Sequence, residues 1–379
     1  LGAFQGRVVR SLRGKAAFRH RAFRRAILRH MPENFRRRLH RLAAWILEER
    51  GAPELEVGMH LSRAGEHDAC LPRLLSGLEQ LVADGSRQSS LRVARRIHVH
   101  LEHLPDGEQT SRWHLRADML QAQANVLAGQ RPRAQRLLRQ SVARAAALAD
   151  RVTRGEALVH LADLAVNEGR FLGALDHIER AHRLLEEARS QGEARAEEWS
   201  ARALARHARA LGWMGHGHDA LVRIRSALAL APGELRPLRV TLMIDQARCE
   251  ALLDHFPTAL GIMDRVDHML QWEHLPLLAV RLQLYRGRIL SQIGARSGAM
   301  DAFRQVVAEA RRLSLHREHA LALLYGAEDH LQAGDEGAAR ACLRAAAGLA
   351  EKAGDKVART AIAVLRYKMG EPDALPRAT

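Results

Sequence analysis

Small and large apolar residues recur at a fixed spacing through the C-terminal two thirds of the chain. Relative to each of six alanines, the position four residues later is large and apolar, and the position seven later is small or β-branched. These offsets fall on one stripe of a helix with 3.6 residues per turn, so each segment is predicted to be an amphipathic helix. The alanines stand 39 to 46 residues apart, at Ala134, Ala174, Ala220, Ala259, Ala299 and Ala339.

Each predicted helix is preceded by a turn residue and by a small residue further upstream. Five residues before the alanines stand Gly129, Gly169, Gly215, Asp254, Gly294 and Gly334, and twelve before stand Ala122, Ala162, Ala208, Ala247, Gly287 and Ala327. Glycine takes positive φ readily, and a small residue lets two helices approach closely. The pattern therefore predicts helix hairpins that must stack to bury their stripes. We expect an all-α fold, a right-handed superhelical solenoid whose concave face is lined by the first helices.

This spacing resembles the tetratricopeptide repeat over about residues 107–354. The period is near 40 residues where that repeat has 34. The aromatic expected on the first helix is replaced by Asn125, Ala165, Leu211, Glu250, Leu290 and His330. Long, divergent repeats of this kind resemble those of bacterial regulatory ATPases such as the maltose-regulon activator class. The resemblance implies the fold, and it transfers no peptide-clamp residues.

The repeat frame continues upstream in a less regular form. Two overlapping matches begin only 20 residues apart, one around Cys70 and Leu74 and the other around Ser90 and Ala94. We therefore expect residues 51–106 to form irregular helical repeats and residues 107–370 to form a solenoid of about six units. Residues 371–379 are expected to fray as a polar tail.

The first fifty residues lack the repeat and are expected to form a basic helical segment. Pro32 and Glu33 predict the first turn of a helix that runs to about Arg50. The run from Phe18 to Ala44 resembles the junction between the winged-helix end of an AAA-type or STAND-type regulatory ATPase and its helical repeats. The resemblance implies that an ATPase or kinase lies outside this chain, which begins without Met, and that the repeats sense an inducer or partner.

The net charge of +16 is concentrated in this segment. Residues 1–50 carry a net +11, so the remaining chain is nearly balanced. A basic run of this kind can bind nucleic-acid phosphates, with affinity that falls steeply as salt rises. The competing interpretation is a solvated or interdomain face, because the run contains no recognisable DNA-reading helix.

The sequence contains no motif that points to catalysis, a cofactor or a metal. Gly14-Lys15 lacks the first glycine and the hydroxyl residue of a phosphate-binding loop. The His98, His100 and His103 cluster, and the pair His216 and His218, have no carboxylate or Cys partner at a ligand spacing. We expect no enzymatic activity, no cofactor and no metal site. Three widely spaced cysteines and the absence of an apolar span or leader favour a cytoplasmic protein.

One column of positions favours a binding site in the predicted groove. The positions eleven residues before the six alanines are Gln123, Asp163, Arg209, Arg248, Arg288 and Glu328, so three consecutive arginines would line one wall. Arg202 and Arg281 stand seven residues before Arg209 and Arg288. Arginine forks suit carboxylates and phosphates, so we hypothesise a groove for an acidic peptide or another anionic ligand. Because about one residue in seven is Arg, a chance column of solvated arginines is the competing interpretation.

Taken together, these patterns predict a protein- or ligand-binding sensor or docking module of a bacterial multidomain signalling regulator. One alternative is a free-standing adaptor that assembles other proteins. The other is a nucleic-acid binder that acts through the basic N-terminal segment. No membrane contact is expected.

Overall fold

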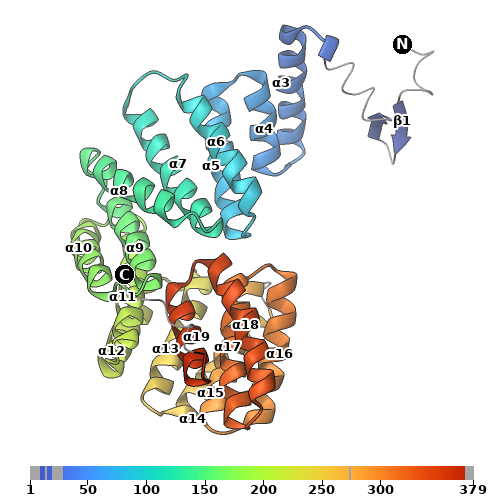
Figure 1. The fold of residues 1–379 in the computed structure, drawn as a ribbon. Helices are drawn as coiled ribbons and strands as arrows, with labels where there is room; N and C mark the ends of the chain where they lie inside the picture. The colour runs from blue at the N-terminus through green and yellow to red at the C-terminus, as the bar shows by residue number, and fades with distance from the viewer. Residues whose placement is uncertain (1–8, 13–14, 19–28, 273–274, 372–379) are drawn as a thin grey trace. The chain divides into compact units, whose positions relative to one another are not determined.

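The computed structural model describes residues 9–12, 15–18, 29–272 and 275–371 (Figure 1). The chain divides into two compact units, with the boundary between Ala124 and Asn125. Side chains are described for residues 29–272 and 275–371. The basic run Arg7 to Arg25 and residues 372–379 of the tail therefore lie outside the described side chains.

The first unit begins with an antiparallel two-stranded ribbon. Strand β1 (Val9–Leu12) pairs with β2 (Lys15–Phe18), so that Val9 lies opposite Phe18. We expected residues 1–50 to form a basic helical segment, and for residues 9–12 and 15–18 that expectation is wrong. In the sequence, Arg13 and Gly14 stand between the two strands.

Helices make up the rest of the first unit. Their bounds are α3 (Glu33–Glu49), α4 (Glu54–Ala64), α5 (His67–Ala83), α6 (Arg87–Leu101) and α7 (Glu108–Leu127), the last of which crosses the unit boundary. The predicted start of α3 after Pro32 is confirmed, and Gly51 after its end has φ of +62°.

The overlapping matches in this unit have a simple origin. Helix α5 packs against both α4 and α6, so it is the second helix of one pair and the first helix of the next. Cys70 and Leu74 of α5 and Ala94 of α6 are buried in one core, and Ser90 of α6 is also buried. Because two helix pairs share one helix, the sequence pattern of a pair begins again after about 20 residues.

The second unit is a solenoid of antiparallel helix hairpins, as predicted. Each helix packs against the next along the chain from α8 to α19. The bounds are α8 (Arg131–Ala147), α9 (Arg151–Asn167), α10 (Phe171–Ser190), α11 (Ala196–Trp213), α12 (Gly217–Leu230), α13 (Arg236–Leu252), α14 (Phe256–Leu270), α15 (Pro276–Gln292), α16 (Arg296–Arg312), α17 (His316–Gln332), α18 (Glu336–Ala353) and α19 (Lys356–Lys368).

The repeat pattern of the sequence matches the observed core. All six aligned alanines are 0% exposed, and the large residues four positions later are at most 3% exposed. The six turn positions all have positive φ, including Asp254 at +59°. The stripe and the turn chemistry read from the sequence are both confirmed.

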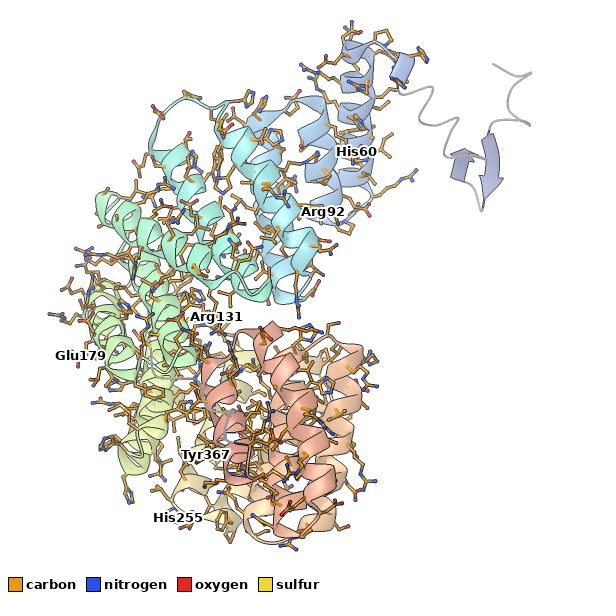
Figure 2. All side chains as sticks on the ribbon, viewed as in Figure 1. His60, Arg92, Arg131, Glu179, His255 and Tyr367 are labelled. Atoms are coloured by element: carbon orange, nitrogen blue, oxygen red, sulfur yellow. The ribbon has the colours of Figure 1, made fainter. Side chains whose placement is uncertain are left out.

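The first helices of successive hairpins form a continuous inner row in the second unit. Contacts link α9 to α11, α11 to α13, α13 to α15, α15 to α17, and α17 to α19. The curvature also brings the start of this unit back to its end. Nη2 of Arg131, at the start of α8, donates to the carbonyl oxygen of Ala353 at the end of α18, 3.1 Å away. Figure 2 labels Arg131 and shows the side chains along these helices.

Two further properties bear on the sequence expectations. In the described part of the chain, no helix is both long and apolar enough to span a bilayer. Cys70, Cys249 and Cys342 are all free thiols, the first two of them buried.

Candidate functional site

Three of the predicted groove arginines lie on adjacent helices of the inner row. Arg209 is on α11, Arg248 on α13 and Arg288 on α15. The positions follow directly from the repeat, because each stands eleven residues before a buried alanine of the following helix. All three side chains are partly buried.

Each of these arginines is held by a carboxylate of the chain itself. Arg209 pairs with Asp163 across a 3.4 Å gap and donates to Oδ1 of Asn167 at 2.7 Å. Arg248 donates to Oδ1 of Asp245 at 2.8 Å. Arg288 forms an ion pair with Glu328 of the next inner helix. The three arginines therefore form a ladder of ion pairs with carboxylates of the chain. The sequence predicted the row of arginines but not these partners.

Two tyrosines interleave with the ladder. The guanidinium of Arg248 lies over the ring of Tyr285, 4.3 Å from its centroid, and that of Arg288 lies over Tyr325 at 4.7 Å. Since Tyr285 precedes Arg288 by three residues on α15, the stack alternates Arg248, Tyr285, Arg288 and Tyr325 across three helices. Contacts of this type stabilise a cation by up to about 2 kcal/mol when it is desolvated. They also fix the plane of each guanidinium.

Sequence reasoning missed both tyrosines and two further inner-row arginines. Tyr285 and Tyr325 are 40 residues apart and stand three residues before Arg288 and Glu328, so one repeat period relates them. Arg206 lies 2.6 Å from Asp163, and Arg317 donates to Asp355 at 2.7 Å. The signal for the tyrosines was present, because a spacing of three residues places them on the same helix face as the arginine column.

Burial and crowding perturb the titration of this interior. Burial lowers the pKa of Arg209 to about 10; Asp163 opposes that shift, while Arg317 and Arg206 add to it. Burial would raise the pKa of Asp163, but Arg206 and Arg209 hold it below its ordinary value. Burial raises the pKa of Tyr325 to about 12. Arg317 of α17 therefore acts on the same interior as Arg206 and Arg209 of α11.

Arginines outnumber their carboxylate partners by one in the ladder itself. Five arginines, at positions 206, 209, 248, 288 and 317, face four carboxylates, at positions 163, 245, 328 and 355. A guanidinium has five N–H donors, so a single carboxylate partner leaves donors for a ligand. The surface is suited to a flexible anionic chain whose carboxylates share these donors.

The other two predicted arginines, Arg202 and Arg281, lie closer to the N-terminal ends of α11 and α15. Arg202, near the start of α11, donates to Oε1 of Glu198 at 3.0 Å and lies 5.1 Å from the ring centroid of Trp199. Arg281, near the start of α15, donates to Oε1 of Glu318 at 3.0 Å. Both lie two helical turns before Arg209 and Arg288, as predicted, and both are paired.

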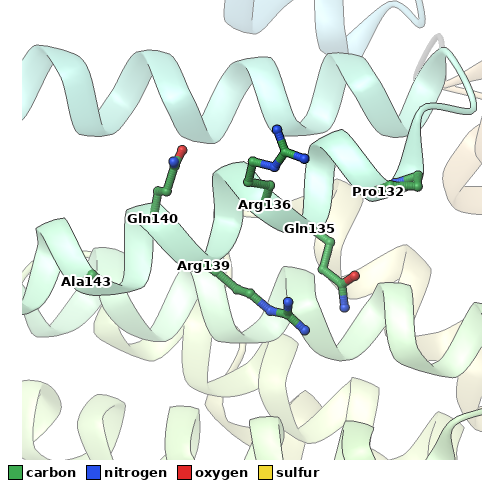
Figure 3. Close-up of a pocket in the computed structure, with 6 residues that line it drawn as sticks. All are labelled: Pro132, Gln135, Arg136, Arg139, Gln140 and Ala143. Carbon is green, nitrogen blue, oxygen red and sulfur yellow. The ribbon is translucent and has the colours of Figure 1, made fainter.

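A separate hollow of about 450 Å³ lies on the exposed face of α8 (Figure 3). The residues that line the hollow all belong to this one helix: Pro132, Gln135, Arg136, Arg139, Gln140 and Ala143. Within the described residues, neither Arg136 nor Arg139 forms an ion pair with a carboxylate. Because a single helix face encloses a ligand poorly, we regard the inner row as the better candidate.

The histidines singled out in the sequence do not assemble a metal centre. Nδ1 of His100 lies 2.9 Å from Nδ1 of His67, whose ring stacks on His103 with centroids 4.5 Å apart. His216 is the N-cap residue of α12 and His218 lies in its first turn, and both are exposed. Among the residues that the structure describes, no group of three or more His, Cys, Asp or Glu side chains is placed to hold a metal ion.

Comparison with known proteins gives the fold and no family. No protein-family model matches the chain, and no curated protein matches its sequence. A Rap protein complexed with competence and sporulation factor has a TM-score of 0.59 at 14% identity, covering 80% of this chain and 84% of that one. The quorum sensor NprR from B. thuringiensis, in its apo form, has a TM-score of 0.60 at 11% identity, with 86% and 90% covered.

A third similar structure belongs to a larger protein. It is a Signal Transduction ATPase with Numerous Domains from Pyrococcus horikoshii, which carries a tetratricopeptide repeat sensor. The TM-score is 0.53 at 12% identity, and the match covers 96% of this chain but 54% of the other. At these identities the likeness concerns the fold, which is that of tetratricopeptide-like helical solenoids.

Proposed function

We propose that the second unit binds an acidic peptide, or an acidic segment of a partner protein, along its inner row of helices. The observation that carries the proposal is the alternating stack of Arg248, Tyr285, Arg288 and Tyr325. It presents fixed guanidinium planes at regular intervals on one face of three adjacent helices. Such a surface matches an extended chain with carboxylates at intervals, since charge-assisted bonds from Arg to carboxylate are strong and directional.

The structural neighbours support a peptide as the ligand. The Rap protein was crystallised with competence and sporulation factor, and an NprR structure contains its cognate peptide NprX. Extending this property to the present chain is part of the proposal, because the sequences are only 14% identical.

The test is a titration of the full chain with a short poly-glutamate peptide that carries a neutral fluorophore. A poly-glutamine peptide of equal length is the ligand control. Replacing Arg209, Arg248 and Arg288 together with Gln should weaken poly-glutamate binding at least tenfold, about 1.4 kcal/mol or more. The matched protein control replaces three exposed arginines of the outer helices, Arg223, Arg265 and Arg344, with Gln, and it should change the affinity less than twofold.

Three results would count against the proposal. The first is equal binding of poly-glutamate and poly-glutamine. The second is an equal loss of affinity in the two triple variants, which would point to net charge alone. The third is unchanged affinity in the inner-row variant.

We further infer that this unit acts as the sensor of a multidomain regulator. The likeness to a STAND protein with a tetratricopeptide repeat sensor supports this, as does the junction-like sequence before Ala44. The inference predicts an in-frame ATPase or kinase domain encoded before Leu1. A start codon immediately before Leu1 would favour the adaptor alternative.

The nucleic-acid alternative makes a separate prediction. It requires binding that weakens steeply with salt and disappears when residues 1–30 are removed. Binding that persists after this deletion would exclude the basic segment as the nucleic-acid site.

A further inference from the structure

Helix α3 presents an unusual number of large apolar side chains to solvent. Among the described residues, no other helix has more than two exposed large apolar side chains, whereas α3 has five, each between 36% and 58% exposed. They are Phe35, Leu39, Leu42, Trp45 and Ile46. Contiguous exposed apolar surface of this kind marks an interaction site more often than scattered residues do.

The exposed face is distinct from the face that α3 packs on α4. The packed side contains Ala44, which is buried, and His40, whose Nδ1 lies 3.2 Å from Nδ1 of His60 on α4. The exposed residues follow the spacing 35, 39, 42 and 46, with Trp45 beside them, which is one continuous stripe of a helix. Helix α3 therefore has two apolar faces, and the described residues of the chain cover only one.

The charges on the exposed stripe are self-complementary. Arg38 lies on it near the start of the helix and Glu49 near the end, and within the described residues neither forms an ion pair. The flanking arginines are already neutralised, because Arg37 pairs with Glu33 and Arg41 with Glu66. The stripe itself therefore carries one positive and one negative charge, eleven residues apart.

We propose that a second copy of this chain covers the stripe, with the two α3 helices packed antiparallel. When the two-fold axis passes midway between residues 43 and 44, Arg38 of one copy faces Glu49 of the other. The same register places Leu42 of each copy against Trp45 of its partner. The interface is isologous, so each contact occurs twice. A parallel arrangement would instead place Arg38 against Arg38 and Glu49 against Glu49.

The charge balance also favours a second copy over an anionic membrane surface. Helices that lie on such membranes carry several unpaired Lys or Arg residues along the polar margin. Here the margin arginines Arg37 and Arg41 are paired within the chain, and Glu49 would be repelled by anionic lipid.

The stripe is small, so the dimer should be weak. One exposed helix face is less than the roughly 800 Å² per partner that stable complexes bury. We expect a dissociation constant on the order of micromolar.

The test is sedimentation equilibrium of the full chain between about 1 and about 100 µM. The weight-average mass should rise from the monomer value of 42.2 kDa toward twice that value. Leu42→Glu should hold the chain at the monomer mass. Leu172→Glu on α10, where the leucine is 75% exposed, is the control and should leave the association unchanged. Circular dichroism verifies that each variant keeps its helix content.

A charge exchange tests the register. Arg38→Glu alone, and Glu49→Arg alone, should each weaken association at least tenfold, because each places like charges together twice. The double variant Arg38→Glu with Glu49→Arg should restore it.

The proposal is overturned by a chain that stays monomeric at every concentration, or by association that Leu42→Glu leaves intact. A double variant that fails to regain the lost affinity overturns the antiparallel register. A monomeric chain that binds vesicles of phosphatidylserine through this helix would show that the stripe contacts membranes.

Discussion

The ring of Phe303 on α16 occupies the space that a Cβ atom on Gly287 of α15 would need. A Cβ built on this glycine would lie 2.8 Å from Cε1 of Phe303. In the other five aligned repeats the first-helix position is Ala, and the residue that aligns with Phe303 is Leu, Ile or Met. The larger ring in this repeat is accommodated by removing the methyl group from its neighbour.

Gly287→Ala should therefore destabilise the second unit, although alanine is the better helix former. Overpacking a well-packed core costs about 1–3 kcal/mol. The measurement is the urea midpoint followed by circular dichroism. Combining Gly287→Ala with Phe303→Leu should recover part of the loss. Gly348→Ala, at a helical glycine with open space around it, is the control and should stabilise by about 0.5–1 kcal/mol. A stable Gly287→Ala variant would contradict the packing described.

Asp254 occupies a turn position where the other five repeats have glycine, and its φ is +59°. This conformation is strained for a residue with a Cβ atom, although Asp tolerates it better than most. Asp254→Gly should raise the free energy of unfolding by about 0.5–1 kcal/mol. The reverse exchange, Gly294→Asp at a φ of +79°, should lower it by a similar amount. Thermal denaturation of the two variants gives shifts of opposite sign if the turn geometry is correct.

Asp355 has two roles, and Asp335, the N-cap residue of the preceding helix, shares only the first of them. Its Oδ1 accepts from the N–H of Ala358, which caps α19, and its Oδ2 accepts from Arg317 in the interior. Its side chain is 3% exposed. Asp335 caps α18 in the same way but is 56% exposed.

Asp355→Asn should therefore destabilise the fold by about 2–4 kcal/mol, because it removes the carboxylate that forms the ion pair with Arg317. Asp335→Asn should cost less than about 0.5 kcal/mol, since Asn caps almost as well as Asp. Chemical denaturation of both variants measures the difference. Equal effects would show that capping alone matters at Asp355.

The pH dependence of stability should contain a contribution from His100. Burial lowers its pKa to about 4, and His67, Arg96 and His103 act in the same direction. For His67, which contacts His100, burial also lowers the pKa, although the nearby carboxylates of Asp68 and Glu66 favour its protonation. In the unfolded chain His100 titrates near 6.5. The stability it contributes is thus complete above pH 6.5 and is lost as the pH falls from 6.5 toward 4, by at most about 1.4 kcal/mol per pH unit.

His100→Gln should flatten this part of the stability profile. His216→Gln, at an exposed histidine, should leave it unchanged. Thermal midpoints measured between pH 7.5 and pH 4 compare the two variants with the parent chain. A His100→Gln profile parallel to that of the parent would refute the assignment.

Much of the fold could be predicted from the sequence, because the spacing of small, large and turn residues in each repeat specifies a helix hairpin. The alanine at 0% exposure, the large residue four later and the turn at positive φ each follow from local rules that neighbouring repeats share. The pairing of β1 with β2 was not predicted, because these strands lie outside the repeat region and their sequence shows no periodic pattern that we recognised.

The candidate site was readable only in part. The column of Arg209, Arg248 and Arg288 lies on the inner row because helix periodicity fixes it. The ion pair of Arg288 with Glu328 joins equivalent positions of neighbouring repeats, whereas the approach of Arg317 to Arg209 depends on how tightly the unit curves. Curvature arises from small rotations summed over many repeats, which no local pattern specifies. Ligand binding by these arginines stays a prediction.

The most direct test of this account locates the ligand on the protein. A short poly-glutamate peptide with a photo-reactive benzophenone side chain at its centre is bound to the full chain, irradiated, and mapped by mass spectrometry. We predict crosslinks to the inner faces of α11, α13, α15 and α17, near Tyr285 and Tyr325, and their loss in the variant with Gln at positions 209, 248 and 288. Crosslinks confined to the hollow on α8 or to residues 1–50 would contradict the proposal that the inner row is the binding surface.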